Sequence, residues 1–277
     1  MTQTPSPLRY PGGKTKLYNY VSNIVNKNMA FGNRIYVEPF AGGAGLALKL
    51  LLSGDVDSLI LNDIDYNIFC FWEACLNNTE ALCNLIDECD VSVDNWRKQK
   101  NIYSFSQTHS PLEVGFASFY LNRCNVSGVI RGGPIGGFDQ LGSYGIDARF
   151  NKNKLIEKIL DIGKRKNVIS IYNLDASAFL LNTINAINSD NLFLNIDPPY
   201  VNKGSQLYEN SFKESDHADL ANVIKLLRHK WMITYDECNL IENLYADFRK
   251  DLICLNYSAG KTRLGNEYVI YCDRLNV

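Results

Sequence analysis

The chain has 277 residues, 46% of them hydrophobic, which is enough to bury the core of one large domain or of a domain with one substantial insertion. This composition excludes a disordered or fibrous chain. The formal net charge of −2 points as a whole to neither a nucleic-acid nor a membrane partner. The charge is nevertheless uneven: residues 1–90 carry 6 basic and 10 acidic side chains, residues 91–166 carry 12 and 6, and residues 167–277 carry 10 and 14. A positive middle between two negative flanks is typical of an inserted segment with an anionic partner of its own.

The cysteines and the N-terminal residues indicate the cellular compartment in which the protein is expected. None of the eight cysteines forms a CxxC pair, and the three histidines stand near none of them in metal-ligand spacing, so we do not expect structural zinc. The first residues do not resemble a signal peptide, and no apolar run approaches membrane-spanning length. We therefore expect free thiols in a reducing cytoplasm and no membrane partner.

Short apolar runs alternate with helical patterns along most of the chain. Strands are predicted at 35–37, 58–61, 168–172, 191–196, 231–234 and 268–272. Helices are predicted at 46–52, 218–227 and 240–248. Alternation of this kind indicates an α/β fold with a doubly wound sheet.

The alternation breaks between about residues 66 and 166. Residues 66–88 are helical in pattern, and residues 122–144, inside the positive segment, contain six glycines. A glycine-rich run this long within a compact chain is more often a functional loop than part of the scaffold. We therefore predict one domain formed by 1–65 and 167–277, and an inserted, mainly helical domain at 66–166.

A glycine turn follows the first predicted strand, in the sequence Glu38-Pro39-Phe40-Ala41-Gly42-Gly43-Ala44-Gly45. In an open parallel sheet, ligands bind at the carboxyl ends of strands, and glycines there let a cofactor approach the backbone. The GGAG spacing differs from the GxGxxG of dinucleotide enzymes, and alone it could be a plain tight turn. Asp63 closes the next strand about twenty residues on, where it could accept hydrogen bonds from ribose hydroxyls or cap the following helix.

Asp197-Pro198-Pro199-Tyr200 follows an apolar strand. Two prolines remove two N–H donors, so this strand end presents only acceptors, namely the Asp197 carboxylate and the Pro198 carbonyl. Tyr200 adds an aromatic face beside them. A flat ring with two N–H donors, such as an exposed adenine, would fit there; the alternative is a proline-terminated strand with a core tyrosine.

Five motifs occur in one order along nearly the whole chain. They are Tyr10-Pro11-Gly12-Gly13-Lys14, Glu38-Pro39-Phe40 with its glycines, Asn62-Asp63, Asp175, and Asp197 to Tyr200. In this order and context the chain resembles the S-adenosylmethionine-dependent DNA adenine N6 methyltransferases of the Dam type, the alpha group with a DPPY motif. The resemblance implies a Rossmann-like catalytic domain that binds S-adenosylmethionine and a target-recognition insert at 66–166 that binds DNA. An NPPY tetrad would instead have suggested a protein-glutamine methyltransferase.

The resemblance implies a set of residues around S-adenosylmethionine. Lys14 would help to hold the cofactor, Phe40 would line it, and Asp63 would bind its ribose hydroxyls. The implied cofactor-binding residues are Tyr10, Gly13, Lys14, Glu38, Phe40, Gly42, Gly45, Asp63, Asp175 and Asp197.

The implied catalytic residues are Asp197, Pro198 and Tyr200. The exocyclic amine of adenine is a poor nucleophile, because its lone pair is delocalised into the ring, and positive charge builds on it as it attacks the sulfonium methyl. Asp197 and the Pro198 carbonyl would accept its two N–H bonds and stabilise that charge. Because the amine is buried in duplex DNA, the base must be extruded, and Tyr200 is the aromatic on which it would stack. No metal and no covalent enzyme intermediate are needed.

Residues 122–131 are similar in spacing to the family's recognition loop. The implied nucleic-acid-binding residues are Asn122, Arg123, Ser127, Val129 and Arg131. Arg131 matches an arginine that reads a guanine edge, and Val129 matches an apolar residue that presses into the base stack. Ser127 stands where GATC-reading members have asparagine, so the recognition sequence stays open. A downstream basic stretch could contact phosphates or could be a solvated helix face; it contains Lys152, Lys154, Lys158, Lys164, Arg165 and Lys166.

Together these residues favour a site-specific DNA adenine N6 methyltransferase. The expected partners are double-stranded DNA and a small-molecule methyl donor, in the cytoplasm of a bacterial or phage-infected cell. We expect a monomer in solution and leave a dimer on DNA open. The alternatives are a methyltransferase acting on RNA or single-stranded nucleic acid, and a catalytically silent DNA-binding relative, against which the intact DPPY motif argues. Whether the role is restriction protection, phage self-protection or epigenetic marking also stays open.

Overall fold

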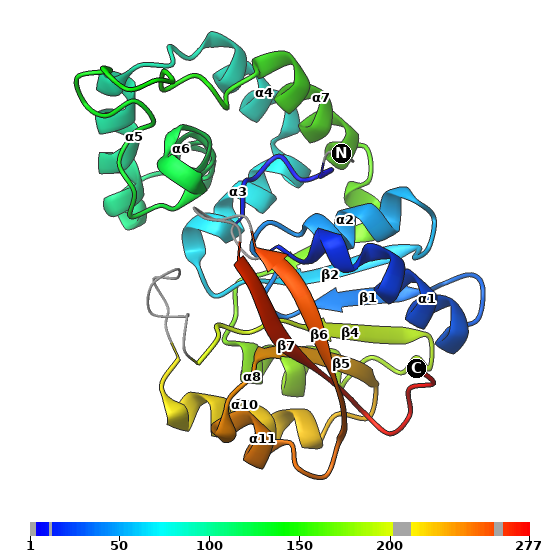
Figure 1. Cartoon of the computed structure of the whole chain (residues 1–277). Coiled ribbons are helices and arrows are strands. Elements are labelled where there is room, and N and C mark those ends of the chain that lie inside the picture. The colour runs from blue at the N-terminus through cyan, green and yellow to red at the C-terminus, as the bar shows by residue number, and fades with distance from the viewer. Residues whose placement is uncertain (1–3, 11–12, 202–211, 258–262) are drawn as a thin grey trace. The chain divides into compact units, whose positions relative to one another are not determined.

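The computed structural model describes residues 4–10, 13–201, 212–257 and 263–277. Internal contacts divide the chain into two compact units, whose elements are labelled in Figure 1. The first unit comprises Met1–Gly13 and Asp65–Ile171, and the second comprises Lys14–Ile64 and Tyr172–Val277. The predicted insert at 66–166 falls within the first unit, to which the N-terminal residues as far as Gly13 also belong.

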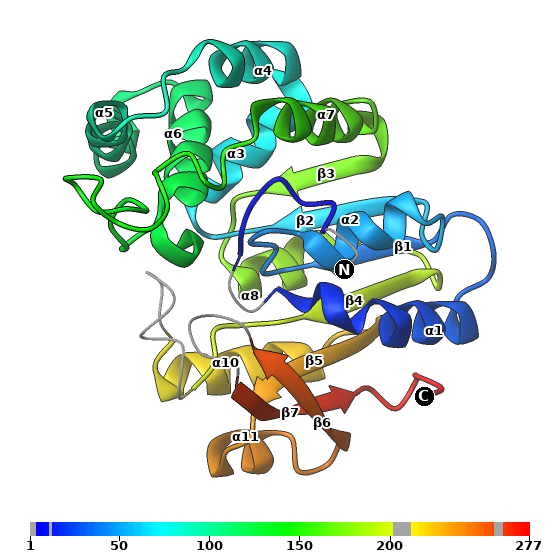
Figure 2. The same ribbon diagram turned by 45° about the horizontal axis from the view of Figure 1, so that its top comes forward.

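A seven-stranded sheet runs in the order β3-β2-β1-β4-β5-β7-β6 (Figure 2). The strands are β1 (Ile35–Glu38), β2 (Ser58–Asn62), β3 (Ile169–Tyr172), β4 (Leu192–Ile196), β5 (Lys230–Asp236), β6 (Arg249–Tyr257) and β7 (Arg263–Tyr271). β1 pairs in parallel with β2 and β4, and β4 pairs in parallel with β5, whereas β7 runs antiparallel to β5 and β6. The predicted α/β fold with a doubly wound sheet is confirmed, with an antiparallel hairpin at one edge.

The strand order reverses between β1 and β4, because the chain runs outward from β1 to β2 and β3 and then returns to β4 and β5. A reversal of this kind opens a crevice at the carboxyl ends of the two neighbouring strands. Glu38 ends β1, and Asp197 follows β4 directly. Every residue of β4 is buried, as expected for a parallel strand that is covered on both faces.

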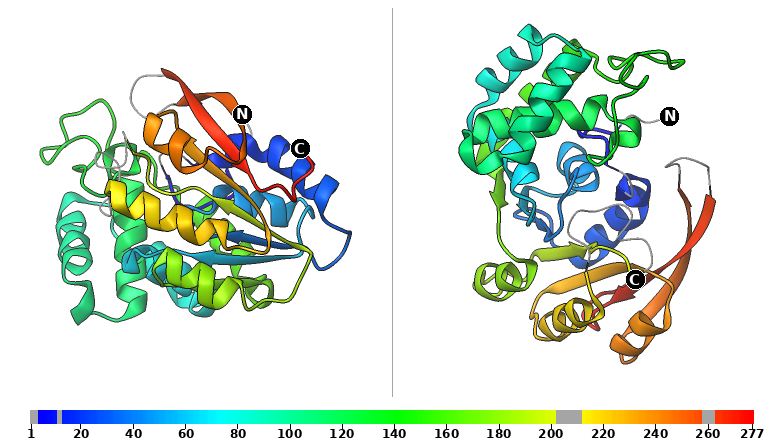
Figure 3. Two further views of the ribbon diagram at one scale, coloured as in Figure 1. Left: turned by 90° about the horizontal axis from the view of Figure 1, so that it is seen from below. Right: turned by 90° about the vertical axis from the view of Figure 1, so that its left-hand side faces the viewer.

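The helices of the second unit cover both faces of the sheet. They are η1 (Lys14–Leu17), α1 (Tyr18–Asn28), α2 (Gly45–Leu52), α8 (Ala176–Ala178), η5 (Phe179–Ile184), α10 (Glu214–Lys225) and α11 (Asn239–Leu244). In Figures 1 and 3, α1 and α2 lie on one face, and α8, α10 and α11 lie on the other. This arrangement follows from right-handed crossovers, because connections that run in opposite directions along a sheet place their helices on opposite faces.

The edge strand β6 was not predicted from the sequence. The helix predicted at 240–248 ends at Leu244, and β6 begins at Arg249. Arg249, Asp251 and Leu252 are exposed, so this strand lacks the apolar alternation that reveals a half-buried strand. Its backbone pairing with β7, which joins Arg249 to Tyr271 in register, supplies the stabilisation instead.

The first unit is helical. Its main helices are α3 (Tyr66–Asn77), α4 (Thr79–Glu88), α5 (Val93–Ser104), α6 (Pro111–Cys124) and α7 (Lys152–Gly163), with the short turns η2 (Ser106–Thr108), η3 (Val126–Gly128) and η4 (Lys166–Val168). The helical stretch predicted at 66–88 is divided at Asn78, which ends α3 and precedes α4. α6 packs against α3, α4 and α5, and most of its residues are buried.

Two local features fix α6. Its N-terminus is a capping box in which Ser110 and Glu113 exchange hydrogen bonds, with Pro111 as the first helical residue. At Gly115 the helix touches α3 closely, because a Cβ there would lie 2.5 Å from the Cys70 carbonyl oxygen. Only glycine therefore permits this packing distance.

Within the described residues, no helix is both long enough and apolar enough to span a membrane. The same residues contain no group of three or more histidine, cysteine, aspartate or glutamate side chains placed to hold a metal ion. All eight cysteines have free thiols.

Candidate active site

The glycine turn after β1 is fixed by a carboxylate from the next strand. Gly42 N donates to Asp63 Oδ2 at 2.7 Å. Ala44 has a φ of 43°, in the left-handed region, and α2 begins at the next residue, Gly45. Residues 41–44 are all buried, so the turn packs without room for large side chains. Asp63 thus shapes the turn as well as standing at the end of β2.

Asp65 and Asp175, near the ends of β2 and β3, cap the helices that follow them. Asp65, and not Asp63, caps α3 by accepting from two of its backbone N–H groups. Asp175, which follows β3, caps α8 through Oδ1, which accepts from two backbone N–H groups at 2.9 and 3.1 Å. The roles of Asp63 and Asp175 toward a nucleoside stay predictions.

The buried Asn62 side chain joins the segments after three strands, a role that its sequence position did not reveal. Nδ2 donates to the carbonyl oxygens of Pro39 and Leu174, each at 3.0 Å, and Oδ1 accepts from Leu174 N at 3.0 Å. Buried amides of this kind hold backbone that would otherwise lack partners. Asn62 therefore keeps the glycine turn and the Asp175 segment at the same edge of the sheet.

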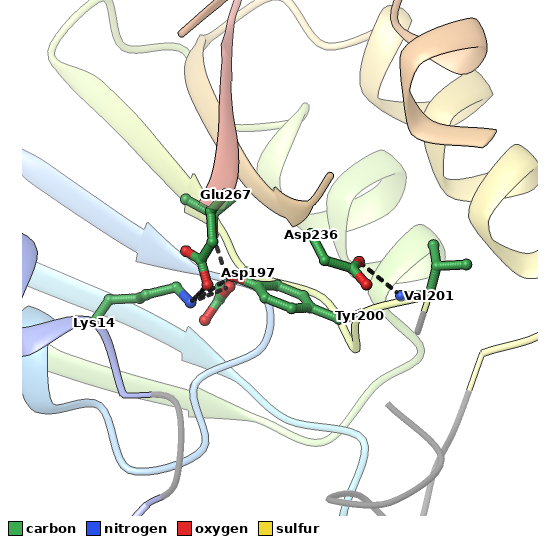
Figure 4. Close-up of polar contacts among 7 residues, drawn as sticks. Lys14, Asp197, Tyr200, Val201, Asp236 and Glu267 are labelled. Carbon is green, nitrogen blue, oxygen red and sulfur yellow. Dashed lines mark hydrogen bonds and ion pairs between the residues drawn. The ribbon is translucent and has the colours of Figure 1, made fainter. Parts of the chain in front are cut away.

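Asp197 lies among side chains from three other elements (Figure 4). Thr234 Oγ1 on β5 donates to Asp197 Oδ1 at 2.7 Å, and Lys14 Nζ lies 3.3 Å from the same oxygen. Lys14 also donates to the Tyr200 hydroxyl at 2.6 Å and lies 3.4 Å from Glu267 Oε1 on β7. Both of these contacts with Asp197 fall on Oδ1.

Sheet order explains how these side chains meet. β4 and β5 are parallel neighbours, so Asp197 and Thr234 reach the same carboxyl edge. Glu267 arrives from β7, where its partner in register is Asp236 of β5. Asp236 Oδ1 in turn accepts from Val201 N at 3.0 Å and holds the chain directly after the DPPY motif. Thr234, Asp236 and Glu267 were not predicted; the only signal in the sequence was polar residues in otherwise apolar strands.

Burial changes the ionisation of the acids at this edge. Glu38 is 6% exposed and accepts from the Tyr36 hydroxyl at 3.0 Å, and burial raises its pKa to about 8. Glu267 is fully buried; burial raises its pKa, and Lys14 acts in the opposite direction. Burial also raises the pKa of Tyr200, so its hydroxyl stays protonated while it accepts from Lys14.

The other predicted catalytic and cofactor residues take different positions. Pro198 is buried, and no donor among the described residues bonds its carbonyl oxygen. Phe40 is partly exposed and meets Phe212 edge-on, with ring centroids 5.9 Å apart. The N-terminal motif is divided: Tyr10 and Gly13 belong to the first unit, where Gly13 N donates to the Tyr10 carbonyl oxygen at 3.2 Å, and the second unit starts after them.

In the first unit, the Asn122 amide clamps the N-terminal segment. Asn122 is 2% exposed; Oδ1 accepts from Arg9 N at 2.7 Å, and Nδ2 donates to the carbonyl oxygens of Arg9 at 2.8 Å and Gly128 at 3.2 Å. Gly128 has a φ of +75°, and a Cβ there would lie 2.5 Å from the Arg9 carbonyl oxygen. The side chain of Asn122 therefore shapes the segment at 122–131 from within.

Arg123 is likewise used inside this unit. Its Nε donates to the Arg149 carbonyl oxygen at 2.7 Å, a second guanidinium nitrogen donates to the same oxygen, and Nη1 donates to the Pro7 carbonyl oxygen at 3.4 Å. Burial lowers the pKa of Arg123 to about 10, which still leaves it charged at neutral pH. Asn125, which was not predicted, is fully buried; its Oδ1 accepts from Trp96 Nε1 at 2.6 Å.

Three of the predicted recognition residues lie at the surface of the same unit. Ser127 and Arg131 are exposed, and Val129 is partly exposed. Ser127 adopts a φ of 57°, in the left-handed region, within the turn η3. The Asn125 amide holds the chain after this turn by donating to the Val129 carbonyl oxygen at 2.8 Å. The surface residues are therefore presented on a fixed backbone.

The basic stretch near α7 is divided between internal and surface roles. Lys152 Nζ donates to the Asp87 carbonyl oxygen at 2.5 Å, and Lys158 Nζ donates to the Thr4 carbonyl oxygen at 2.7 Å. Arg165 forms an ion pair with Asp161, four residues earlier in the chain. The exposed members of the stretch are Lys154, Lys164 and Lys166.

Comparison with known proteins places the chain in a family. Residues 10–255 match the family described as D12 class N6 adenine-specific DNA methyltransferase. The chain is 26% identical over 238 residues to the type II methyltransferase M.MjaIII of Methanocaldococcus jannaschii, and the alignment covers 79% of each chain. It is 24% identical over 216 residues to the modification methylase StsI of Streptococcus sanguinis, which covers 71% of this chain and 28% of that one.

Among solved structures, the rRNA methyltransferase aviRa from Streptomyces viridochromogenes aligns with a TM-score of 0.43 and 13% identity, over 95% of this chain and 86% of that one. The family match at residues 10–255 includes the glycine turn, Asp63 and the Asp197 motif. The chain therefore belongs to the D12 class of N6 adenine-specific DNA methyltransferases.

Proposed function

We propose that this adenine-specific DNA methyltransferase transfers the methyl group of S-adenosylmethionine to the exocyclic amine of a flipped adenine in duplex DNA. Family membership supports DNA as the substrate and a methyl donor as the second reactant. The observation that carries the residue assignment is the fixed orientation of Asp197, whose Oδ1 is held by Thr234 and Lys14. This leaves Oδ2 and the Pro198 carbonyl as two acceptors beside each other.

Two acceptors at this position suit the chemistry of the amine. As the adenine nitrogen attacks, its lone pair leaves the ring and its two N–H groups become more acidic. Asp197 Oδ2 and the Pro198 carbonyl would bind those two hydrogens, favour the pyramidal nitrogen and stabilise the positive charge that develops on it. Holding the nitrogen in line with the methyl group supplies much of the remaining acceleration.

The acidic residues at the strand ends suit a cationic nucleoside such as S-adenosylmethionine. Asp63 and Asp175 follow β2 and β3, at the edge where the glycine turn lies, and Glu38 ends β1 with a raised pKa of about 8. When bound, S-adenosylmethionine supplies an electrophilic methyl group on a sulfonium. We propose that Asp63 accepts from the ribose hydroxyls and that the turn at Gly42 and Gly45 lets the cofactor approach the backbone.

The remaining cofactor residues rest on the resemblance and on their positions. We propose that Phe40, which is partly exposed, lines the cofactor with its ring. Tyr10, Gly13 and Lys14 keep their proposed cofactor roles, and Lys14 has in addition the contact with Asp197. Tyr200 is the aromatic on which the extruded adenine is proposed to stack, because its hydroxyl is held by Lys14 and its ring is partly exposed.

On the DNA side, the structure separates the predicted recognition residues into two groups. We propose that Ser127, Val129 and Arg131 contact DNA, because they lie at the surface. Asn122 and Arg123 are proposed to shape the loop instead, since their side chains bond carbonyl groups of their own unit. The proposed division of labour keeps 1–65 and 167–277 as the catalytic domain and 66–166 as the target-recognition insert, acting as a cytoplasmic monomer.

Tritium transfer tests this assignment. Labelled S-adenosylmethionine is incubated with duplex DNA, duplex RNA and no nucleic acid, and we expect label only on adenine of the DNA. Asp197→Ala should abolish transfer and retain DNA binding, whereas Asp219→Ala, an exposed acidic residue on α10, should behave like the wild type. Absence of label on any DNA with the methyl donor bound would refute the reaction, and near-normal turnover of Asp197→Ala would refute the acceptor assignment.

A further inference from the structure

We propose that Glu267 is a positioning residue that compensates the charge of Lys14, so that the Asp197 pocket keeps a net negative charge where the adenine amine becomes positive. This inference rests on the proposed role of Asp197. Glu267 stands on β7, the last strand along the chain, far in sequence from the DPPY motif, and its ion pair is with Lys14.

The geometry forms a chain of alternating charges. Lys14 Nζ lies 3.3 Å from Asp197 Oδ1 and 3.4 Å from Glu267 Oε1 (Figure 4). The Lys14 side chain is 6% exposed and that of Glu267 is 0% exposed, whereas the Asp197 side chain is 22% exposed. The lysine and the glutamate are therefore buried, and the aspartate is the most exposed of the three.

Net charge explains why the third group is needed. Lys14 orients Asp197, but a lone ammonium at this distance would cancel most of the carboxylate's field at the amine. A positive charge that develops on the amine would then gain little from Asp197. With Glu267 ionised as well, the three groups sum to one negative charge, and Lys14 can fix the geometry of Asp197 without weakening its electrostatic effect.

Burying Glu267 as a carboxylate is costly unless a cation such as Lys14 lies beside it. A carboxylate without solvent needs a charged partner and hydrogen bonds, and among the described residues Oε2 has no hydrogen-bond partner. The groups that face Glu267 are Lys14, Asp197 and Tyr200, together with Asp236, its partner in register on β5. Lys14 is the one cation among these four, which makes it the group that Glu267 neutralises.

Glu267→Gln tests the inference, because it removes the charge and keeps the shape. The measurement is the single-turnover rate of methyl transfer to duplex DNA at saturating cofactor, with dissociation constants for DNA and cofactor measured separately. We expect the rate to fall by about tenfold or more while both dissociation constants change by less than about threefold. The control is Glu242→Gln, which makes the same change in net charge at an exposed acidic residue on α11 and should leave the rate unchanged.

A double variant separates charge compensation from a purely structural role. Lys14→Met combined with Glu267→Gln removes both charges, leaves no unpaired buried ion, and restores a single negative charge on Asp197. With Lys14→Met alone as the reference, we expect Glu267→Gln to cost much less rate in the Lys14→Met background than in the wild type. A structural role for Glu267 predicts an equal loss in both backgrounds, since each change would add its own loss.

The outcomes are distinguishable from failure of the proposed function. If Asp197→Ala remains active, the acceptor assignment fails first, and the role of Glu267 falls with it. If Asp197→Ala is inactive, a near-normal rate in Glu267→Gln would overturn the inference about Glu267 alone. An equal loss of rate from Glu267→Gln with and without Lys14 would overturn it too.

Discussion

Thr234→Val should slow methyl transfer without weakening DNA binding. Thr234 is fully buried on β5, and its Oγ1 donates to Asp197 Oδ1 at 2.7 Å. Valine replaces the hydroxyl with a methyl group of nearly the same size, so the variant removes one hydrogen bond and leaves the packing of the strand largely intact. The loss frees Asp197 to rotate away from the direction that presents Oδ2 to the amine.

The expected size follows from the partners of Asp197. A hydrogen bond to a charged group contributes about 1.5 to 3 kcal/mol. Asp197 is 22% exposed, and Lys14 remains 3.3 Å from the same oxygen, so the lower end of that range applies. A change of about 1.4 kcal/mol corresponds to a factor of ten, so we expect the rate of the chemical step to fall by roughly tenfold.

Single-turnover measurement at saturating cofactor and DNA reports that step directly. Thr108→Val is the control, because the Thr108 hydroxyl donates at 2.8 Å to the Phe105 carbonyl oxygen within the helical unit, whereas Asp197 belongs to the other unit. We expect Thr108→Val to retain the wild-type rate. A Thr234→Val protein that is folded, binds DNA normally and transfers methyl groups at the wild-type rate would show that Thr234 does not orient Asp197.

Three further predictions concern stability and recognition. Glu38 has a pKa of about 8 in the folded protein against an ordinary value of 4.5, so between these pH values the folded state holds a proton that the unfolded state has lost. The free energy of unfolding should therefore fall as pH rises, by up to about 1.4 kcal/mol per pH unit. In urea titrations from pH 5 to 8, Glu38→Gln should lack this slope. The same dependence of the unfolding free energy on pH in the wild type and in Glu38→Gln would contradict this assignment. Gly115→Ala should lower the free energy of unfolding by about 1 to 3 kcal/mol, because the new Cβ would overlap the α3 backbone, whereas Gly133→Ala, with nothing within 4 Å, should be near neutral in the same assay. Arg131→Ala should relax preference at one base position by about 1 to 3 kcal/mol in competition binding with substituted duplexes, and Arg123→Ala should instead lower stability; a uniform loss of affinity in Arg131→Ala would identify a phosphate contact.

Much of the candidate active site could be predicted, because its motifs are local. The apolar strand followed by Asp197 and two prolines places an acceptor-rich turn at a strand end, whichever strands lie beside it. The glycine turn after β1 works the same way, since its backbone geometry depends on consecutive small residues. Asp63 was predicted for its place at the end of β2, and that place also lets it hold Gly42 N.

The recognition segment shows where local reasoning stops. Asn122 and Arg123 lie next to each other at the end of α6, and their polar side chains look available for DNA in the sequence. In the fold, both side chains donate to carbonyl groups of distant segments. Asn122 bonds Arg9, which is 113 positions away in the chain, and Arg123 bonds Arg149, which is 26 positions away. Contacts that are remote in sequence therefore decide where these two side chains point. Ser127 and Arg131, in contrast, are exposed at the surface of the same unit.

The sequence by itself determined the α/β alternation, the order of the motifs and the chemistry that Asp197 and Pro198 can offer, because these depend on residue type and on neighbours along the chain. Only the tertiary structure decided that Thr234, Lys14 and Glu267 surround Asp197. Each comes from a different element, and their meeting depends on strand order and on the antiparallel insertion of β7 beside β5. Charge compensation between buried groups depends on distance in space, and spacing along the chain does not encode it.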